Sequence, residues 1–112
     1  MPCNARVVQM AKIAGEIPTI EKLRDIFKNH QGAVEAIEGG YRIHIGVVVA
    51  DINIKAKTII LKSYAADWDT GVKQLQALLK MIRETGIPLE DIGQPETHRH
   101  DEAAAPWQRV TN

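Results

Sequence analysis

An alternating segment interrupted by two glycines constrains this chain more than any other feature. Residues 33–38 alternate in character, Gly39 and Gly40 follow, and a second alternating run extends from Tyr41 to Val49. Two glycines supply the positive φ angles of a type I′ turn, so the segment predicts a β-hairpin with a two-residue loop.

The expected loop also sets the register of the hairpin. With Gly39 and Gly40 as the loop, Glu38 pairs with Tyr41, and Glu35 lies opposite His44 on the more polar face. The other face is then apolar, and we expect it to carry Val34, Ala36, Tyr41, Ile43, Ile45, Val47 and Val49.

The chain after Val49 changes phase, because the apolar positions become even-numbered at Ile52. A bulge or tight turn at Ala50-Asp51 accounts for that change. A third strand of the meander then extends from Ile52 to Tyr64, either continuously or with an interruption near residues 55–57.

Three further elements surround the meander. Residues 5–13 suit a strand, and Pro18-Thr19 opens a helix that stops near His30. Asp67 is a good N-cap for a second helix, which Gly86 ends. The apolar stripe of this helix consists of Trp68, Val72, Leu75, Leu79 and Ile82.

Together these elements predict an α+β fold of the order βαβββα, with a mainly antiparallel sheet and two helices packed on one face. We expect a single domain over residues 1–93 and a polar, mobile tail over 94–112. The order of the strands stays open, since the first strand could pair at an edge or with a neighbouring subunit.

The composition narrows the classes of function. Lys plus Arg and Asp plus Glu are each 14, so the net charge is zero and nucleic acid is not an expected partner. Cys3 stands alone, no leader is visible and no apolar run approaches the roughly 18 residues of a membrane span, so a cytoplasmic location is expected. Near-neutral charge removes one barrier to self-association, which favours a homodimer.

The sheet face away from the helices is the leading candidate for a binding site. We expect it to expose a surface of mixed polarity that suits a protein partner, formed by Glu35, Ile37, Arg42, His44 and Val48. Glu35 and His44 could serve as a general acid and base, but an ordinary stabilising cross-strand pair is the favoured interpretation.

The C-terminal segment offers a candidate metal site. It concentrates imidazoles and carboxylates that are competent ligands for a divalent metal, namely His98, His100, Asp101 and Glu102. No matching third or fourth ligand is indicated elsewhere, so a solvated tail is favoured and no cofactor is expected.

The N-terminus offers an enzymatic alternative. Removal of Met1 would leave Pro2 with a secondary amine at the start of a strand. This opening, with the following strand and helix and loosely residues 86–90, resembles tautomerases that use an amino-terminal proline as a general base. That resemblance implies a cofactor-free tautomerase or isomerase, although we place no catalytic arginine.

A third alternative comes from topology alone. The helix, meander and helix order resembles double-stranded RNA-binding domains and ribosome-associated hibernation factors, which implies contact with RNA. The last helix, however, offers only Lys73, Lys80 and Arg83 as cations. The sequence therefore favours a non-enzymatic binding or assembly protein that acts through an open sheet face or an edge.

Overall fold

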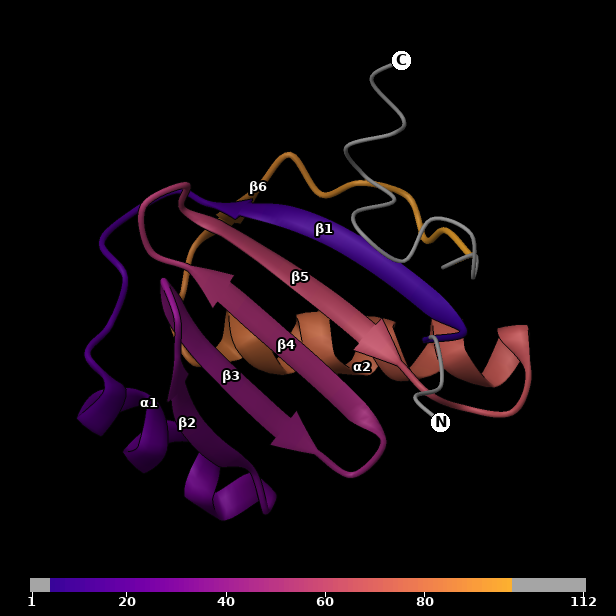
Figure 1. The fold of residues 1–112 in the computed structure, drawn as a ribbon, viewed down its shortest axis with the longest axis horizontal. Helices are drawn as coiled ribbons and strands as arrows, with labels where there is room; N and C mark the ends of the chain where they lie inside the picture. The colour runs from indigo at the N-terminus through magenta and orange to yellow at the C-terminus, as the bar shows by residue number, and fades with distance from the viewer. Residues whose placement is uncertain (1–4, 98–112) are drawn as a thin grey trace.

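The computed structural model describes residues 5–97, which form one antiparallel sheet and two α-helices (Figure 1). The elements in chain order are β1 (Val7–Ile13), α1 (Ile20–Phe27), a 3₁₀ helix (Lys28–His30), β2 (Ala33–Ile37), β3 (Gly40–Ile45), β4 (Val48–Asn53), β5 (Thr58–Ser63), α2 (Trp68–Glu84) and β6 (Leu89–Glu90). The expected α+β class is confirmed. The expected three-stranded meander is wrong in its strand count, because β2 to β5 make four strands.

The two helices begin where capping chemistry predicts. The Thr19 side chain accepts a hydrogen bond from the Lys22 N–H at 3.2 Å, and the Asp67 carboxylate accepts one from the Thr70 N–H at 2.9 Å. Each cap satisfies a backbone donor that has no partner within the helix. The N-cap predicted at Asp67 is therefore confirmed.

The first hairpin has a register that differs from the predicted one. Ile37 pairs with Gly40, so the loop is Glu38-Gly39, and Glu35 lies opposite Arg42 rather than His44. Of the two loop residues only Gly39 has a positive φ, at 81°, whereas a type I′ turn needs both. Each residue of β2 thus pairs with a residue two positions earlier on β3 than predicted. Because two is an even number, every side chain stays on its predicted face.

Gly40 is required for a different reason than turn geometry. It lies inside β3, where an added Cβ would come within 1.7 Å of the Ile52 carbonyl oxygen on β4. Glycine at this position therefore allows the close approach of two backbones, and Gly39 alone supplies the turn conformation.

The alternating run from Tyr41 to Val49 is not one strand. A turn at Gly46-Val47, with a φ of 61° at Gly46, divides it into β3 and β4, and Ile45 pairs with Val48. The pairing then runs without a break to the far end of both strands, so the bulge predicted at Ala50-Asp51 is wrong. A two-residue turn moves the inward positions from odd to even numbers, which explains the phase change.

The interruption suggested near residues 55–57 is confirmed. A turn separates β4 from β5 there, and the Ile54 N–H donates to the Gly39 carbonyl at 3.0 Å. The run from Ile59 to Leu61 then lies in a central strand, because β5 pairs with both β4 and β1.

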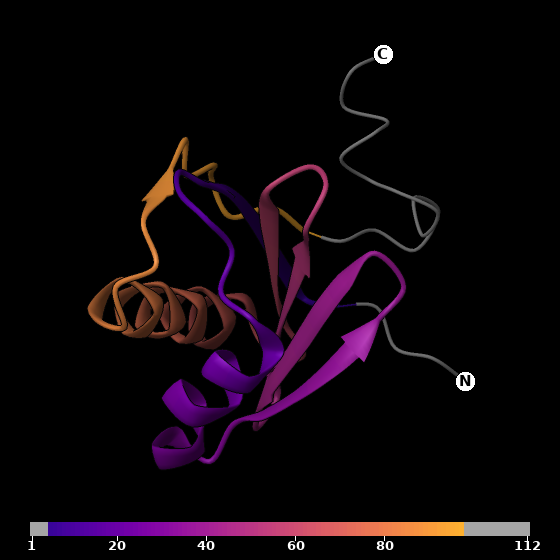
Figure 2. The same ribbon diagram turned by 90° about the vertical axis from the view of Figure 1, so that its left-hand side faces the viewer.

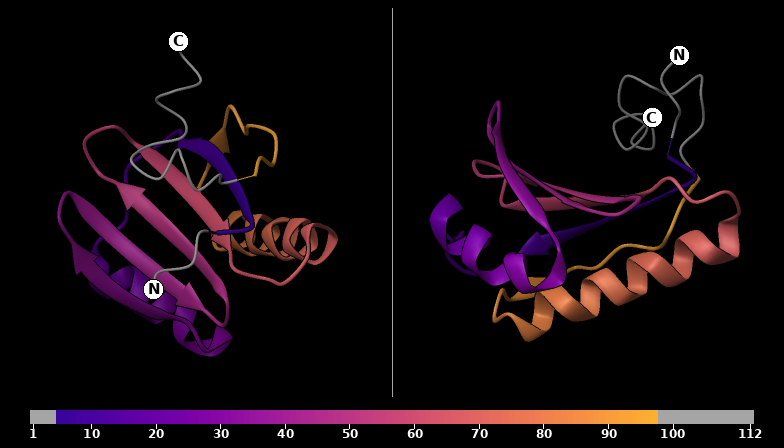
Figure 3. Two further views of the ribbon diagram at one scale, coloured as in Figure 1. Left: turned by 45° about the vertical axis from the view of Figure 1, so that its right-hand side comes forward. Right: turned by 90° about the horizontal axis from the view of Figure 1, so that it is seen from below.

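The strand order is β2-β3-β4-β5-β1-β6, and both helices lie on the same side of the sheet (Figures 2 and 3). The core lies between the helices and this sheet face. Its fully buried larger side chains are Val7, Leu23, Phe27, Ile43, Ile52, Ile59, Leu61, Leu75 and Ile82. At Gly71 of α2 an added Cβ would lie 2.6 Å from Val7, so the helix approaches β1 closely at this point.

The paired chain extends beyond residue 93, where the sequence suggests that the domain ends. β6 pairs with the end of β1, and the Gly93 N–H donates to the Met10 carbonyl at 2.7 Å. Glu96 and Val8 exchange two backbone hydrogen bonds of 2.7 Å each. Residues 89–96 therefore cover the outer edge of β1 (Figure 1).

Gly40 and Gly39 allow a direct test of the hairpin. Gly39→Ala should cost about 1–2 kcal/mol, the penalty for a non-glycine residue in the left-handed region. Gly40→Ala should cost at least about 3 kcal/mol, because the new methyl group meets backbone that cannot move away alone. Urea denaturation of both variants measures the difference, and an equal loss would contradict the assigned register.

Candidate functional site

The sheet face that the helices leave uncovered is the candidate site. The pairing register places two rows of side chains across this face. One row is Glu35, Arg42, Asp51, Ile60 and Met10; the other is Ala33, His44, Val49, Lys62 and Val8. We call these residues, together with Ile37 and Tyr64 but without the buried Val8, the open face.

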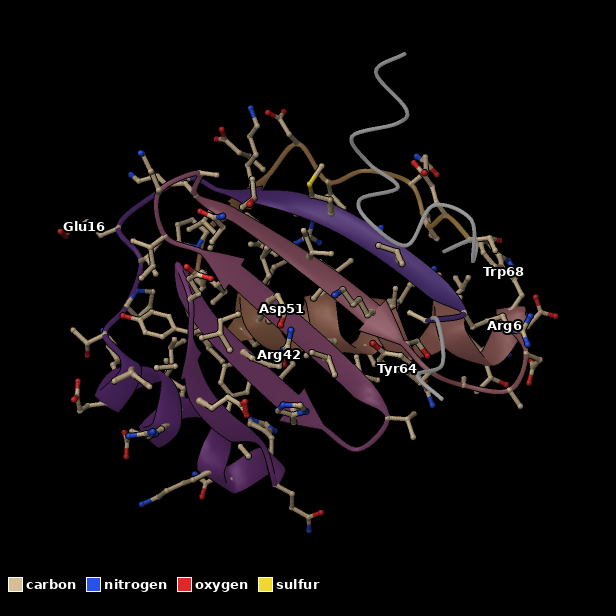
Figure 4. The ribbon with its side chains drawn as sticks, in the orientation of Figure 1. Arg6, Glu16, Arg42, Asp51, Tyr64 and Trp68 are labelled. Atoms are coloured by element: carbon tan, nitrogen blue, oxygen red, sulfur yellow. The ribbon has the colours of Figure 1, made fainter. Side chains whose placement is uncertain are left out.

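Asp51 lies at the centre of the open face and holds together three strands. The Arg42 guanidinium on β3 makes a bidentate contact with this carboxylate: Nε donates to Oδ1 at 2.7 Å and Nη2 donates to Oδ2 at 3.0 Å (Figure 4). Lys62 on β5 adds a contact from Nζ to Oδ2 at 3.3 Å. The Asp51 side chain is only 15% exposed, so these charges are partly shielded from water.

Two opposing effects act on the Asp51 carboxyl. Burial raises its pKa, but the hydrogen bond from Arg42 and the positive charges of Lys62 and Arg42 together outweigh burial, and the net pKa lies below the ordinary value. The pKa of Arg42 is raised in turn, chiefly by its hydrogen bond to Asp51. Both groups are therefore ionised throughout the physiological pH range.

Glu35 and His44 form a looser pair beside this network. His44 Nε2 lies 3.6 Å from Glu35 Oε2, along a diagonal, because Ala33 is the residue directly opposite His44. The distance exceeds that of a hydrogen bond, and both side chains are about half exposed, at 43% and 54%. The geometry favours an ordinary surface pair over an acid and base.

The structure brings together most of the predicted site. Glu35, Ile37, Arg42 and His44 share the open face, as their positions in the register require. Val48 does not belong to it: this side chain is buried on the helix-covered face. Val49 takes its place on the open face, because the turn at Gly46-Val47 reverses the parity of β4.

Sequence reasoning missed the other two residues of the network, Asp51 and Lys62. Asp51 is directly opposite Arg42 on β4, and Lys62 lies one strand further, diagonal to Asp51. Taking Gly46-Val47 as a two-residue turn would have paired positions 42 and 51 at once. Gly46, which lies inside the alternating run, was therefore the sequence signal for this turn.

Apolar side chains surround the charged network. Met10 is 38% exposed and Tyr64 is 42% exposed, which is high for side chains of this size. Tyr64 follows β5 in phase with Lys62, and Val49 and Ile60 are half-buried between the charged side chains. The open face thus combines a polar centre with apolar flanks.

Each edge of the sheet has at least one backbone group already bound within the chain. At the β2 edge, Arg24 of α1 donates from Nε to the Val34 carbonyl oxygen at 3.1 Å. Residues 89–96 pair with the edge of β1. A paired edge is a poorer template for another chain, so the β1 edge is less suited to strand addition than the β2 edge, where only the Val34 carbonyl is bound within the described residues.

The other candidate residues lie outside the described part of the chain. This applies to Pro2 and to the predicted metal ligands His98, His100, Asp101 and Glu102. Within residues 5–97 no group of three or more His, Cys, Asp or Glu side chains is placed to hold a metal ion.

Neither helix in the described residues has both the length and the apolar character to cross a membrane. Comparison with models of protein families and with curated proteins finds no match to this chain. The function must therefore be inferred from the geometry of the fold.

Asp51→Asn tests the network through the pH dependence of stability. Because the pKa of folded Asp51 lies below its ordinary value of 3.8, its ionised form stabilises the fold above that pH, and the contribution is lost as pH falls further. At neutral pH the substitution should lower the free energy of unfolding by about 1–3 kcal/mol. Urea denaturation should show that the difference in the free energy of unfolding between Asp51→Asn and wild type becomes smaller in strong acid.

Asp25→Asn is the matched control. Asp25 on α1 lies with its Oδ1 3.9 Å from Nζ of Lys28 in the following 3₁₀ helix, and its side chain is 79% exposed. An exposed pair of this kind contributes about 0–1 kcal/mol, so the control should change little at any pH. Equal losses in both variants would contradict a special role for the shielded network.

Proposed function

We propose that this chain is a small binding or assembly protein that works as a homodimer in the cytoplasm, with the open face as its interface. One observation carries the proposal: the Arg42, Asp51 and Lys62 network occupies the middle of a sheet face that no described helix covers. Sheets with one apolar face and one solvated face are common, so exposure alone would not support an interface. The side chains on this exposed face are what favour an interface.

The residue types on the open face are those that protein interfaces favour. Arginine, tyrosine and methionine are enriched at interfaces, and Arg42, Tyr64 and Met10 all lie here. Arg42 is already held by Asp51 in the single chain. Its ordering therefore costs little further side-chain entropy when a partner binds.

The charges of the open face support a second copy as the partner. Glu35 and Asp51 balance Arg42 and Lys62, so two copies of this face do not meet with a net charge of one sign. A two-fold interface uses the same patch on both subunits, which requires self-complementarity of this kind. The same balance disfavours a phosphate backbone as partner.

Charge reversal on the open face tests the proposal. The double variant Arg42→Glu with His44→Glu should weaken dimerisation by about 100-fold or more, because like charges brought together at an interface cost several kcal/mol. Sedimentation equilibrium measures the dissociation constant directly. Arg83→Glu with His30→Glu is the matched control, since both residues are exposed on helical segments away from the open face.

A second variant separates the interface from the stability of the fold. Arg42→Glu places a carboxylate beside Asp51 and weakens the sheet itself, whereas Met10→Glu leaves the ion network intact. Met10→Glu should also dissociate the dimer, with a thermal unfolding midpoint close to that of wild type. A wild-type monomer at high concentration, or a dimer that both open-face variants retain, would overturn the proposal.

A further inference from the structure

A second surface lies on the other side of the sheet, where the β3–β4 turn meets α2. A groove of about 420 Å³ opens there, and its walls are almost entirely apolar. Its apolar lining consists of Ile45, Val47, Val48, Ala77, Leu78 and Met81. Ile45 and Val48 point to the helix-covered face, so the groove is separated from the open face by the sheet itself.

Gln74 is the polar side chain in this lining, and one hydrogen bond, from Ser63, holds its amide oxygen. The buried Ser63 hydroxyl accepts from the Ala65 N–H at 3.2 Å and donates to Gln74 Oε1 at 2.7 Å. With its oxygen held by Ser63, the amide directs its Nε2 donors away from that contact. Since Oε1 is bound and Gln74 lines the groove, Nε2 is the part of this amide that remains to donate to an acceptor there.

The surface of α2 next to the groove is positively charged. Ala77 lines the groove, and its four neighbours on the helix surface, three and four residues away, are Lys73, Gln74, Lys80 and Met81. This set contains two cations and no acidic residue. An anionic head group near Ala77 would therefore meet favourable charge as well as the Gln74 donor.

We propose that this groove binds a small amphiphile with an apolar body and one carboxylate, such as a medium-chain acid. The apolar walls contact the hydrocarbon part of the ligand, and Gln74 Nε2 donates to the ligand carboxylate. Lys73 and Lys80 lie near this carboxylate in water. The volume falls in the range of about 300–1,000 Å³ that is typical of small-molecule sites. The inference is independent of the function proposed for the open face, because it uses different residues.

A titration of the full chain with octanoate tests the groove. Binding is followed through the chemical shifts of the backbone amides. Octanoate should produce saturable shifts at residues 45–48 and 74–81, and butyrate should bind at least tenfold more weakly because it buries fewer methylene groups. Ala77→Trp should abolish the octanoate shifts by filling the groove. Gln76→Trp is the matched control, since Gln76 is exposed one residue earlier on α2 and does not line the groove.

Gln74→Glu tests the head group. The new carboxylate still accepts from Ser63 Oγ, but it replaces the amide donor with a second oxygen, so octanoate affinity should fall tenfold or more. Gln76→Glu makes the same change in charge away from the groove and should have a much smaller effect. The uncharged probe octan-1-ol should be affected less by Gln74→Glu than octanoate is.

Three results would overturn the proposal. The first is the absence of saturable shifts when octanoate is added to the wild-type chain, and the second is an Ala77→Trp variant whose shifts equal those of wild type. If instead Ala77→Trp converted a dimer to a monomer by sedimentation while octanoate had no effect, the groove would be an interface between copies. That outcome is distinct from failure of the open-face proposal, which the Met10→Glu variant reports separately.

Discussion

Every face of this sheet depends on the pairing of β3 with β4 through the turn at Gly46 and Val47. The side chains of a strand alternate between two faces, so a turn shifted by one residue would send one strand's inward set outward. In the observed register Ile43 lies opposite Ala50 in the core, and Arg42 lies opposite Asp51 on the open face. The same pairing thus builds the core and the ion network together.

The network on the open face gives geometry more than stability. A partly buried charge loses hydration free energy, and the attraction of its partners offsets about the same amount. The net contribution to the free energy of unfolding is therefore modest. What the three strands gain is a fixed arrangement of Arg42 and Lys62 around one carboxylate. A surface ordered in advance costs less to bind, which is why the open face and the groove beside α2 are the two surfaces of interest.

Local chemistry in the sequence predicted the helices and the first hairpin well. Thr19 and Asp67 are capping residues whose hydrogen bonds reach only three positions along the chain, so neighbouring residues suffice to predict them. The first hairpin was located correctly, but its loop was misplaced by one residue. Gly40 was assigned to the turn, although it is needed because Ile52 on a third strand comes too close for a side chain.

The candidate site was predictable only in part. Period-two alternation placed Glu35, Ile37, Arg42 and His44 on one face, since the shift in register was an even number of positions. Val48 was misplaced and Asp51 and Lys62 were missed, because their positions depend on a turn that the alternating pattern concealed.

The sequence by itself determined the α+β class, the helix boundaries and the alternation within each strand, because these follow from contacts between near neighbours. Only the tertiary structure decided the order of the strands, which places β1 between β5 and β6. It also decided the covering of the β1 edge by residues 89–96 and the meeting of Gln74 with Ser63. Residues 89–96 and β1 are far apart in the chain, and the meeting of Gln74 with Ser63 requires α2 to pack back onto β5, so neither depends on a local pattern alone.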